Sequence, residues 1–388
     1  MPIELSRSYI NKIRLRYQNS TKKEKTLILN EFCQVCEYTR KYAIRVLTGK
    51  VQPRLKKPGP KSKYADPKFI FHLVELWQLM GEINSKKMKE AIPHWLPFCK
   101  GLTAHHKALI LEISPASIDR HLKPHKSPQA RGLSSTKPSA LKNKIPLKLL
   151  EEHVNYPGFI EADTVAHCGE SLSGEFVNTL TMTDLHSGWT ENRALFTKTS
   201  EQVVKQVKRI ESRLPFDIVG VAVDNGTEFL NYELHKYLTD RKAPLSFVRR
   251  RPYKKNDNAH VEQKNFTHVR QLLGYERIDD EKAVGMINEI YQVYFNPLQN
   301  FFIPSQKLIK KERVGSKIKK IFDKPKTPYQ RLLDSPYVSN LQKRKLKEMY
   351  KQKNPIFLSK QLNKKLKELR EYLDTLSKPR LQRAVSDS

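Results

Sequence analysis

Three acidic residues occupy positions where a carboxylate does little for stability and is suited to chemistry. Asp163 interrupts an apolar segment, where a charge costs free energy unless it meets a cation. Asp224 ends a second apolar run and leads into Asn225 and Gly226, a turn-forming pair. Glu262 lies near the start of a helical pattern that follows a polar run. Carboxylate oxygens are the ligands that Mg²⁺ prefers, so these residues predict a metal site if the fold brings them together.

The surrounding pattern predicts a fold that can do this. Strand signals are followed by alternating helices and strands, which predicts a mixed five-stranded sheet covered by helices. Asp163 then lies within a strand, Asp224 at the carboxyl edge of the sheet and Glu262 on a helix, and these three places can converge on one point. The expected strands are 158–167, 175–184, 188–196, 218–223 and 245–248, and the expected helices are 200–214, 232–239, 259–273 and 280–294.

Other acidic residues in this region have ordinary structural roles open to them. Glu161 shares a strand face with Asp163 because side chains alternate along a strand. Asp184 stands at a hairpin turn at 185–187, where aspartate is common for backbone reasons. Glu228 is placed to cap the next helix, and Asp257 to cap the helix that carries Glu262. We therefore favour Asp163, Asp224 and Glu262 over any of these substitutes.

The charge of the chain is high and unevenly distributed. The 388 residues include 72 Lys and Arg against 40 Asp and Glu, a net charge of +32 that points to a polyanionic partner. Residues 1–150 carry 30 basic and 10 acidic residues, and residues 301–388 carry 24 and 8. The middle segment, 151–300, carries 18 and 22. Basic ends are suited to phosphate backbone, and an acidic centre needs its carboxylates for another purpose.

Residues 1–50 show two short helical patterns, 22–33 and 39–47, separated by a turn. With Thr39 as N-cap, the apolar residues of the second helix face inward and its basic residues face outward. This arrangement matches a helix-turn-helix whose second helix enters the major groove, although a plain helical hairpin explains the pattern equally well. The outward residues, and candidate DNA contacts, are Arg40, Lys41 and Arg45.

Two basic connectors flank a second helical region. Residues 51–66 combine prolines with Arg54, Lys56 and Lys57 and are expected to follow DNA backbone as a linker. Region 67–125 is expected to be helical and to finish with a helix, a turn and a second helix. Ser114 is the N-cap of the second helix, and Pro115 is at its first position. Residues 126–150 form the second linker. Ser117 and Arg120, together with Lys123, are the candidate DNA contacts of the second helical region.

The four cysteines make neither a disulfide framework nor a zinc finger. Cys33 and Cys36 are spaced like zinc ligands, but no histidine precedes His72, and Cys99 and Cys168 are too far apart to supply the second pair. Two small residues at a turn between helices explain the pair better. With no continuous apolar secretory segment, these features predict a cytoplasmic protein, associated with the nucleoid in a bacterium.

The carboxyl-terminal region, 301–388, begins strongly basic and is expected to be mostly helical. Helical patterns cover 329–333, 339–352 and 359–376. In the last of these, Leu362, Leu366, Leu369 and Leu376 are close to heptad spacing. They are expected to pack against their own domain, with a dimer seam as the alternative.

The segments IEADT around Asp163, VDNGTEF around Asp224 and NDNAHVEQKN around Glu262 resemble those of the DDE transposases and retroviral integrases. The order matches, and 60 and 37 residues separate the three acids. The resemblance covers about 155–300 within a core domain at 151–300, and it implies a ribonuclease H-like fold. It also implies two Mg²⁺ ions, with Mn²⁺ as a substitute, held by Asp163, Asp224 and Glu262 and used to cut and rejoin DNA.

The expected function is that of an insertion-sequence transposase, which binds terminal inverted repeats of double-stranded DNA and transfers strands as a homodimer or larger assembly. Two alternatives are a retrovirus-like integrase, which the missing zinc module disfavours, and a sequence-specific DNA-binding regulator. Three clustered acids would repel phosphate in a protein that only binds DNA. The candidate DNA contacts of the core are Arg250, Arg251, Lys254, Lys255, Lys264 and Arg270.

Overall fold

The computed structural model describes residues 7–50, 63–126, 155–223, 232–242, 244–249, 263–314 and 317–386. The chain divides into two compact units, Met1–Ala65 and Asp66–Ser388. None of the described helices is long and apolar enough to cross a membrane.

The first unit contains three helices, α1 (Arg7–Asn19), α2 (Lys22–Cys36) and α3 (Arg40–Leu47). The two helices expected from the sequence are confirmed, with Thr39 at the N-cap position of α3, whereas α1 was not predicted. A capping box between Thr21 and Glu24 starts α2. The helices enclose one apolar cluster, to which α2 and α3 contribute Leu29, Phe32, Cys36, Ala43, Val46 and Leu47.

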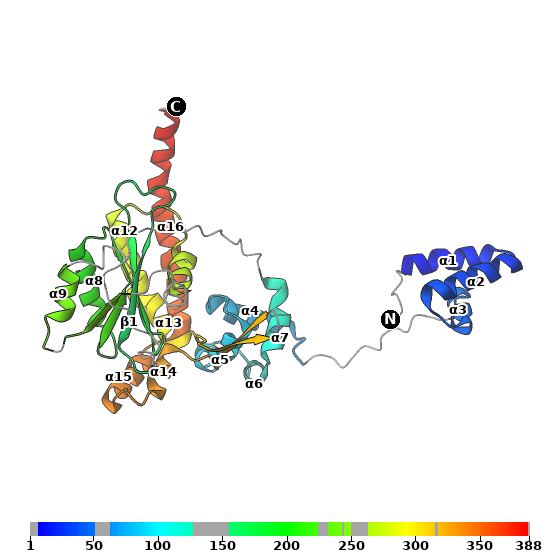
Figure 1. Ribbon diagram of the computed structural model, residues 1–388, viewed down its shortest axis with the longest axis horizontal. Helices are drawn as coiled ribbons and strands as arrows, with labels where there is room; N and C mark the ends of the chain where they lie inside the picture. Colours follow the sequence, from blue (N-terminus) through cyan, green and yellow to red (C-terminus); the bar gives the residue numbers. More distant parts are fainter. Residues whose placement is uncertain are drawn as a thin grey trace. The chain divides into compact units, whose positions relative to one another are not determined.

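The second unit is built around the expected mixed five-stranded sheet, in the order β3-β2-β1-β4-β5. The first three strands form an antiparallel meander, and β4 and β5 run parallel to β1. Figure 1 shows α8 and α9 on one side of the sheet and α12 and α16 on the other. The strands are β1 (Phe159–Ala166), β2 (Asn178–Asp184), β3 (Thr190–Leu195), β4 (Gly220–Val223) and β5 (Ser246–Arg249).

The helices that cover the sheet lie close to their expected positions. Thr199 caps α8 (Ser200–Glu211), and α9 (Tyr232–Thr239) follows β4 in the chain. On the other side, the described part of the expected helix 259–273 is a π-helix, η5 (Asn265–Arg270), followed by α11 (Gln271–Leu273). The next helix is longer than expected and also contains a π segment. Its parts are α12 (Glu281–Glu289), η6 (Ile290–Phe295) and α13 (Asn296–Phe302).

Strand β4 can lie in the middle of the sheet because it begins with a glycine. A Cβ atom at Gly220 would come within 2.5 Å of the Phe159 ring and 3.0 Å of the carbonyl oxygen of Ser246. Only a residue without a side chain allows β1 and β5 to approach β4 this closely.

The helical region at 67–125 belongs to the same compact unit as the sheet. The indole N–H of Trp95 donates to the carbonyl of Phe302 at 3.1 Å, and the hydroxyl of Ser359 donates to the carbonyl of Leu79 at 2.7 Å. The expected cap is present, since Ser114 accepts the backbone N–H of Ser117. Its helices are α4 (Pro67–Leu79), α5 (Ser85–Trp95), α6 (Ala104–Glu112) and α7 (Pro115–Leu122), with short 3₁₀ turns at Leu96–Phe98 and Lys123–His125.

The carboxyl-terminal region contains the three expected helices and a hairpin that was not predicted. The helices are α14 (Pro328–Asp334), α15 (Asn340–Lys351) and α16 (Pro355–Ser386). The hairpin pairs β6 (Leu308–Val314) with β7 (Lys317–Phe322) in the basic segment that precedes them. Leu362, Leu366 and Leu369 are buried on α16, which packs against α12, η6 and α13. These leucines therefore serve their own unit and are not a dimer seam.

Candidate active site

Asp163 lies on β1 at the point where the strand becomes less buried. The strand is fully buried from Phe159 to Ala162, and burial is intermediate at Asp163 and Thr164. One carboxylate oxygen, Oδ1, accepts the backbone N–H of Thr164 at 2.8 Å. The other, Oδ2, accepts the side-chain amide of Asn265 at 2.6 Å. The carboxylate is thus fixed in orientation from two sides.

The neighbouring parallel strand ends beside Asp163. In the register of β1 and β4, Ala162 is the partner of Val223, the last residue of β4. Asp224 is the next residue in the sequence, but it lies outside the described residues, as does Glu262. The predicted triad therefore stays a prediction, of which Asp163 is the member whose surroundings are described.

The helix after Glu262 is fastened to β1 and β3 along its length. Asn265 bonds Asp163, and His268 is buried with Nδ1 3.1 Å from Oδ1 of Asn192 on β3. Arg270 donates to the carbonyl of Ala166 at 3.0 Å, and its guanidinium lies 5.0 Å from the ring centre of Tyr275. Arg270 was predicted as a DNA contact, and in the structure at least one of its donors holds the helix on the sheet.

Asn265 was not singled out from the sequence. Its amide nitrogen faces Asp163, while its oxygen Oδ1 is buried with no hydrogen-bond partner among the residues that the structure describes. A buried acceptor without a partner is costly, so this oxygen is suited to a donor that is not part of the described chain. The signal in the sequence was its position, three residues after Glu262 in the helix expected at 259–273.

Lys264, one of the predicted DNA contacts, is only partly exposed. Its Nζ lies 3.3 Å from Nε2 of His268, and it lines a cavity together with Lys87. Burial is the main cause that lowers the pKa of Lys264, to about 7, and the charges of Lys87 and Arg331 add to it. Burial also lowers the pKa of His268, helped by the charge of Lys264.

The chemistry of the donors favours magnesium over zinc. Asp163 supplies carboxylate oxygens, and the orphaned Oδ1 of Asn265 is an amide oxygen close to it. These are hard oxygen donors, which suit Mg²⁺ and which zinc sites rarely use alone. No group of three His, Cys, Asp or Glu side chains able to hold a metal occurs within the described parts of the chain. Cys36 is buried and Cys33 packs against the same apolar cluster, in keeping with two small residues at a turn.

Two other acids of the core are buried, and one of them, Asp184, has a structural role. Asp184 is buried and accepts the backbone N–H groups of Gly158 at 2.8 Å and Ser187 at 2.7 Å, as expected for an aspartate at a turn. Burial raises the pKa of this carboxyl. Glu161 is buried on the same face of β1 as Asp163. Glu228 and Asp257 lie outside the described residues.

A row of side-chain amides holds the free edge of the sheet and was missed in the sequence. Among the strands that the structure describes, β3 pairs with β2 alone, and a sheet edge leaves backbone groups to be satisfied. Asn300 accepts the N–H of Thr190 and donates to its carbonyl, both at 2.9 Å. Asn288 makes the same pair of bonds with Ala194, also at 2.9 Å. Between them, Gln292 accepts from Arg193 and Asn296 donates to the carbonyl of Asn192.

Two of these amides, those of Asn296 and Asn300, also donate hydrogen bonds to the buried Glu191. Oε1 of Glu191 accepts the indole N–H of Trp189 at 3.0 Å, and Oε2 accepts the amide of Asn296 at 2.9 Å. Burial raises the pKa of Glu191, and these hydrogen bonds oppose the rise. Because its oxygens are occupied inside the fold, Glu191 is a structural residue.

The predicted DNA contacts outside the core have mixed outcomes. Arg40, Lys41 and Arg45 are exposed on α3, although Arg40 also donates to Oδ1 of Asn30. Arg120 is exposed on α7. Ser117 is buried and its hydroxyl accepts from Arg120, so it does not face a partner. The residues Arg54, Lys56, Lys57, Arg250, Arg251, Lys254 and Lys255 lie outside the described residues.

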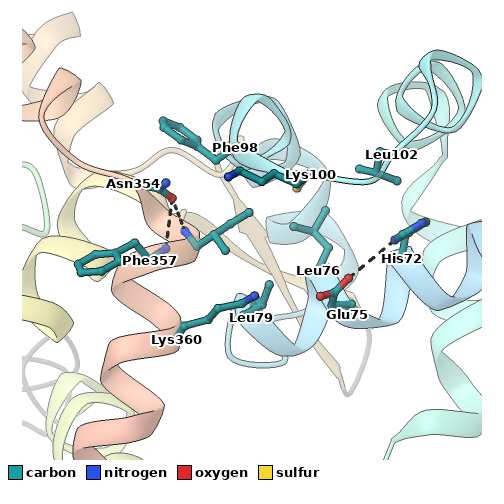
Figure 2. A pocket seen from close by; sticks show the side chains of 12 residues that line it. His72, Glu75, Leu76, Leu79, Phe98, Lys100, Leu102, Asn354, Phe357 and Lys360 are labelled. Carbon is teal, nitrogen blue, oxygen red and sulfur yellow. Dashed lines mark hydrogen bonds and ion pairs between the residues drawn. The ribbon is translucent and has the colours of Figure 1, made fainter.

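Figure 2 shows a cavity of about 290 Å³ between α4, the segment after α5 and the start of α16. Several of its polar groups have local partners, and Lys100 and Lys360 also line it. His72 lies 3.7 Å from Glu75, and Asn354 accepts the backbone N–H groups of Ile356 and Phe357, which caps α16. No pair of groups here is arranged for catalysis among the residues that line it, and Asp163 is not among them.

No protein-family model matches the chain. Over 328 residues it is 35% identical to "Uncharacterized protein y4rM" of Sinorhizobium fredii, a match that covers 81% of this chain and 91% of that protein. The chain therefore belongs to the same family as this Sinorhizobium protein.

Solved structures similar to part of the chain are retroviral integrase cores. The HTLV-2 integrase catalytic core domain in complex with magnesium is 17% identical with a TM-score of 0.24, over 30% of this chain and 68% of that one. The catalytic core domain of BIV integrase is 15% identical with a TM-score of 0.27, over 45% of this chain and 91% of that one. Similarities of this strength do not decide what the chain does.

Proposed function

We propose that the chain is a transposase, a DNA strand transferase that binds the ends of a mobile element. Its active centre consists of Asp163, Asp224 and Glu262 with bound Mg²⁺. The observation that carries this proposal is the position of Asp163, on a central strand beside the end of β4 and in contact with the helix that follows Glu262. In this arrangement the carboxylate is partly exposed and oriented by hydrogen bonds, as a metal ligand must be.

Chain connectivity supports the other two members. Val223, the residue before Asp224 in the sequence, pairs with Ala162, and consecutive Cα atoms are about 3.8 Å apart, so we expect Asp224 to lie close to Asp163. Asn265 contacts Asp163, and residues three apart share a face of a regular helix, so we expect Glu262 to lie on the face that meets Asp163.

Residues around Asp163 hold the proposed active centre in place. Asn265 holds one carboxylate oxygen of Asp163, and Arg270 and His268 keep the helix at a fixed distance from the sheet. The three carboxylates would hold two Mg²⁺ ions, which would supply the positive charge that makes a water or a 3′ hydroxyl nucleophilic and that neutralises the leaving oxygen. The exposed Arg40, Lys41 and Arg45 of α3 supply a basic helix face suited to the major groove.

Strand transfer with a duplex that carries the element's ends tests the proposal. We expect wild-type protein to nick and join DNA with Mg²⁺ or Mn²⁺, and Asp163→Asn to bind the ends without nicking or joining. Asp217→Asn is the matched control, because this exposed aspartate lies three residues before β4, at its other end. Equal joining by wild type and Asp163→Asn overturns the proposal. Binding without joining in wild-type protein points instead to a DNA-binding regulator.

The basic ends are tested separately by salt. If they neutralise about six phosphates, the affinity for DNA falls by about a thousand-fold between 50 and 200 mM salt. Replacing Arg40, Lys41 and Arg45 by glutamine should make this dependence less steep, and an unchanged slope excludes α3 from the DNA interface.

A further inference from the structure

A second cavity, of about 460 Å³, lies against the helix that contacts Asp163. Its walls come from the turn between α4 and α5, the helix after Glu262, α13 and α16. Lys264, which lines it, is the residue immediately before Asn265. Polar side chains at the cavity wall include Gln78, Gln263, Gln299, Ser359 and Asn363.

Two lysines from distant parts of the sequence face this cavity. Lys87 comes from the first turn of α5 and Lys264 from the helix on the sheet, and both are only partly exposed. Both side chains therefore bring positive charge to the same cavity. Neither makes an ion pair with a carboxylate in the part of the chain that the structure describes. Glu82, the carboxylate in the described lining, is exposed.

A pair of partly buried cations without an anion is unfavourable, because each loses water and each repels the other. An anion with several oxygens relieves both costs, since one oxygen can accept from each ammonium group. The amide and hydroxyl groups of the wall can donate to the remaining oxygens. A phosphate group has this charge and this number of acceptors.

We propose that this cavity is a phosphate-binding site in which Lys87 and Lys264 together hold one phosphate group. The phosphate comes either from a DNA strand that passes Asp163 or from a free phosphate group. Binding of a DNA phosphate rests on the proposed function, because Lys264 is next to Asn265, which contacts the proposed catalytic residue Asp163. Phosphate binding itself does not depend on it.

Binding of inorganic phosphate to the full-length protein tests the site without DNA or metal. Calorimetry and thermal stability are measured in phosphate and in chloride at equal ionic strength. We expect Lys87→Gln to bind phosphate about ten-fold more weakly or worse, the effect of losing one charge-assisted hydrogen bond. Lys86→Gln is the matched control, because Lys86 is exposed on α5, does not line the cavity and loses the same charge. Lys87→Arg keeps the charge and should keep binding, which separates loss of the site from loss of the fold.

A short oligonucleotide without Mg²⁺ identifies the source. If Lys87→Gln weakens both phosphate and oligonucleotide and the two compete, the site holds a DNA phosphate; if it weakens phosphate alone, the site holds a free phosphate group. Equal phosphate binding by wild type and Lys87→Gln, or none by wild type at millimolar phosphate, overturns the proposal. Failure of the proposed function would appear instead as equal strand transfer by wild type and Asp163→Asn.

Discussion

Replacing Asn300 by leucine tests whether side-chain amides hold the free edge of the sheet. The Asn300 side chain is 1% exposed, and its two polar atoms satisfy both backbone groups of Thr190, which is itself fully buried. Leucine has the same branching and the same number of side-chain heavy atoms, with bulkier methyl groups in place of the amide, so the change removes the hydrogen bonds without leaving a cavity. The N–H and the C=O of Thr190 are then buried without their partner.

The magnitude follows from these two groups. A buried polar group that loses its partner costs about 1–3 kcal/mol, and a carbonyl with a second lone pair tends toward the lower end. Two such groups give about 3 kcal/mol of lost stability, with part of the loss offset by the greater hydrophobicity of leucine. The bond from Asn300 to Glu191, at 3.4 Å, is long and adds little.

Urea unfolding of wild type and Asn300→Leu measures this loss, and amide hydrogen exchange locates it. We expect a lower urea midpoint with an unchanged m-value, together with faster exchange at Thr190. Asn340→Leu is the control, because Asn340 is exposed at the start of α15 in the same compact unit. Equal stability of Asn300→Leu and wild type, with Thr190 still protected, would refute the role given to these amides.

Three further predictions concern the sheet and the helix on it. Gly220→Ala should destabilise the unit by about 2 kcal/mol, because the new Cβ meets a ring and a backbone carbonyl. Gly285→Ala in α12 should stabilise it by about 0.5–1 kcal/mol, since nothing lies within 4 Å of that Cβ. Denaturant titration of both variants measures the two changes in unfolding free energy, and equal changes would contradict the packing argument. Burial and the charge of Arg270 lower the pKa of His167 from 6.5 to about 4, so between these values the unfolded state binds a proton that the folded state does not, and stability falls as the pH falls. Between pH 6.5 and about 4, the free energy of unfolding of His167→Gln should fall by about 3 kcal/mol less than that of wild type. Unfolding curves at several pH values measure this, and the same pH dependence in both proteins would contradict it. Asn265→Ala should lower the rate of strand transfer about ten-fold with DNA binding retained, since Asp163 loses a hydrogen bond to a charged acceptor; an unchanged rate would remove Asn265 from the positioning of the site.

The elements with strong local patterns could be predicted from the sequence. The strands were recognisable because β-branched and apolar residues run between turn signals, as in β2 from Thr179 to Thr183, whereas the equally buried β3 carries Glu191, Asn192 and Arg193 in its middle. Helix starts were recognisable where a capping residue precedes an apolar period, as at Ser114 and Thr39. Asp163 was identified for the same local reason, since a charge within an apolar strand is conspicuous.

Contacts between distant residues could not be predicted in this way. Asn265 is separated from Asp163 by about a hundred residues, and Lys87 from Lys264 by still more, so no local pattern links them. The hairpin of β6 and β7 left a weak signal, because Gly315 and Ser316, a turn-forming pair, separate two short runs that mix apolar and basic residues. From the sequence, the segment was identified only as a strongly basic stretch before the carboxyl-terminal helices.

The π segment η6 explains why the amide row works over its full length. Asn288, Gln292, Asn296 and Asn300 are four residues apart, and four residues of an α-helix exceed one turn by about 40°. Over three steps a regular α-helix would turn the last amide about 120° away from the first, and off the strand. The π segment Ile290–Phe295 lies in the middle of the row, and its wider turn rotates less per residue, which counters this drift. The amides can therefore stay in line along the edge of β3. The period of a regular α-helix would not have predicted this alignment.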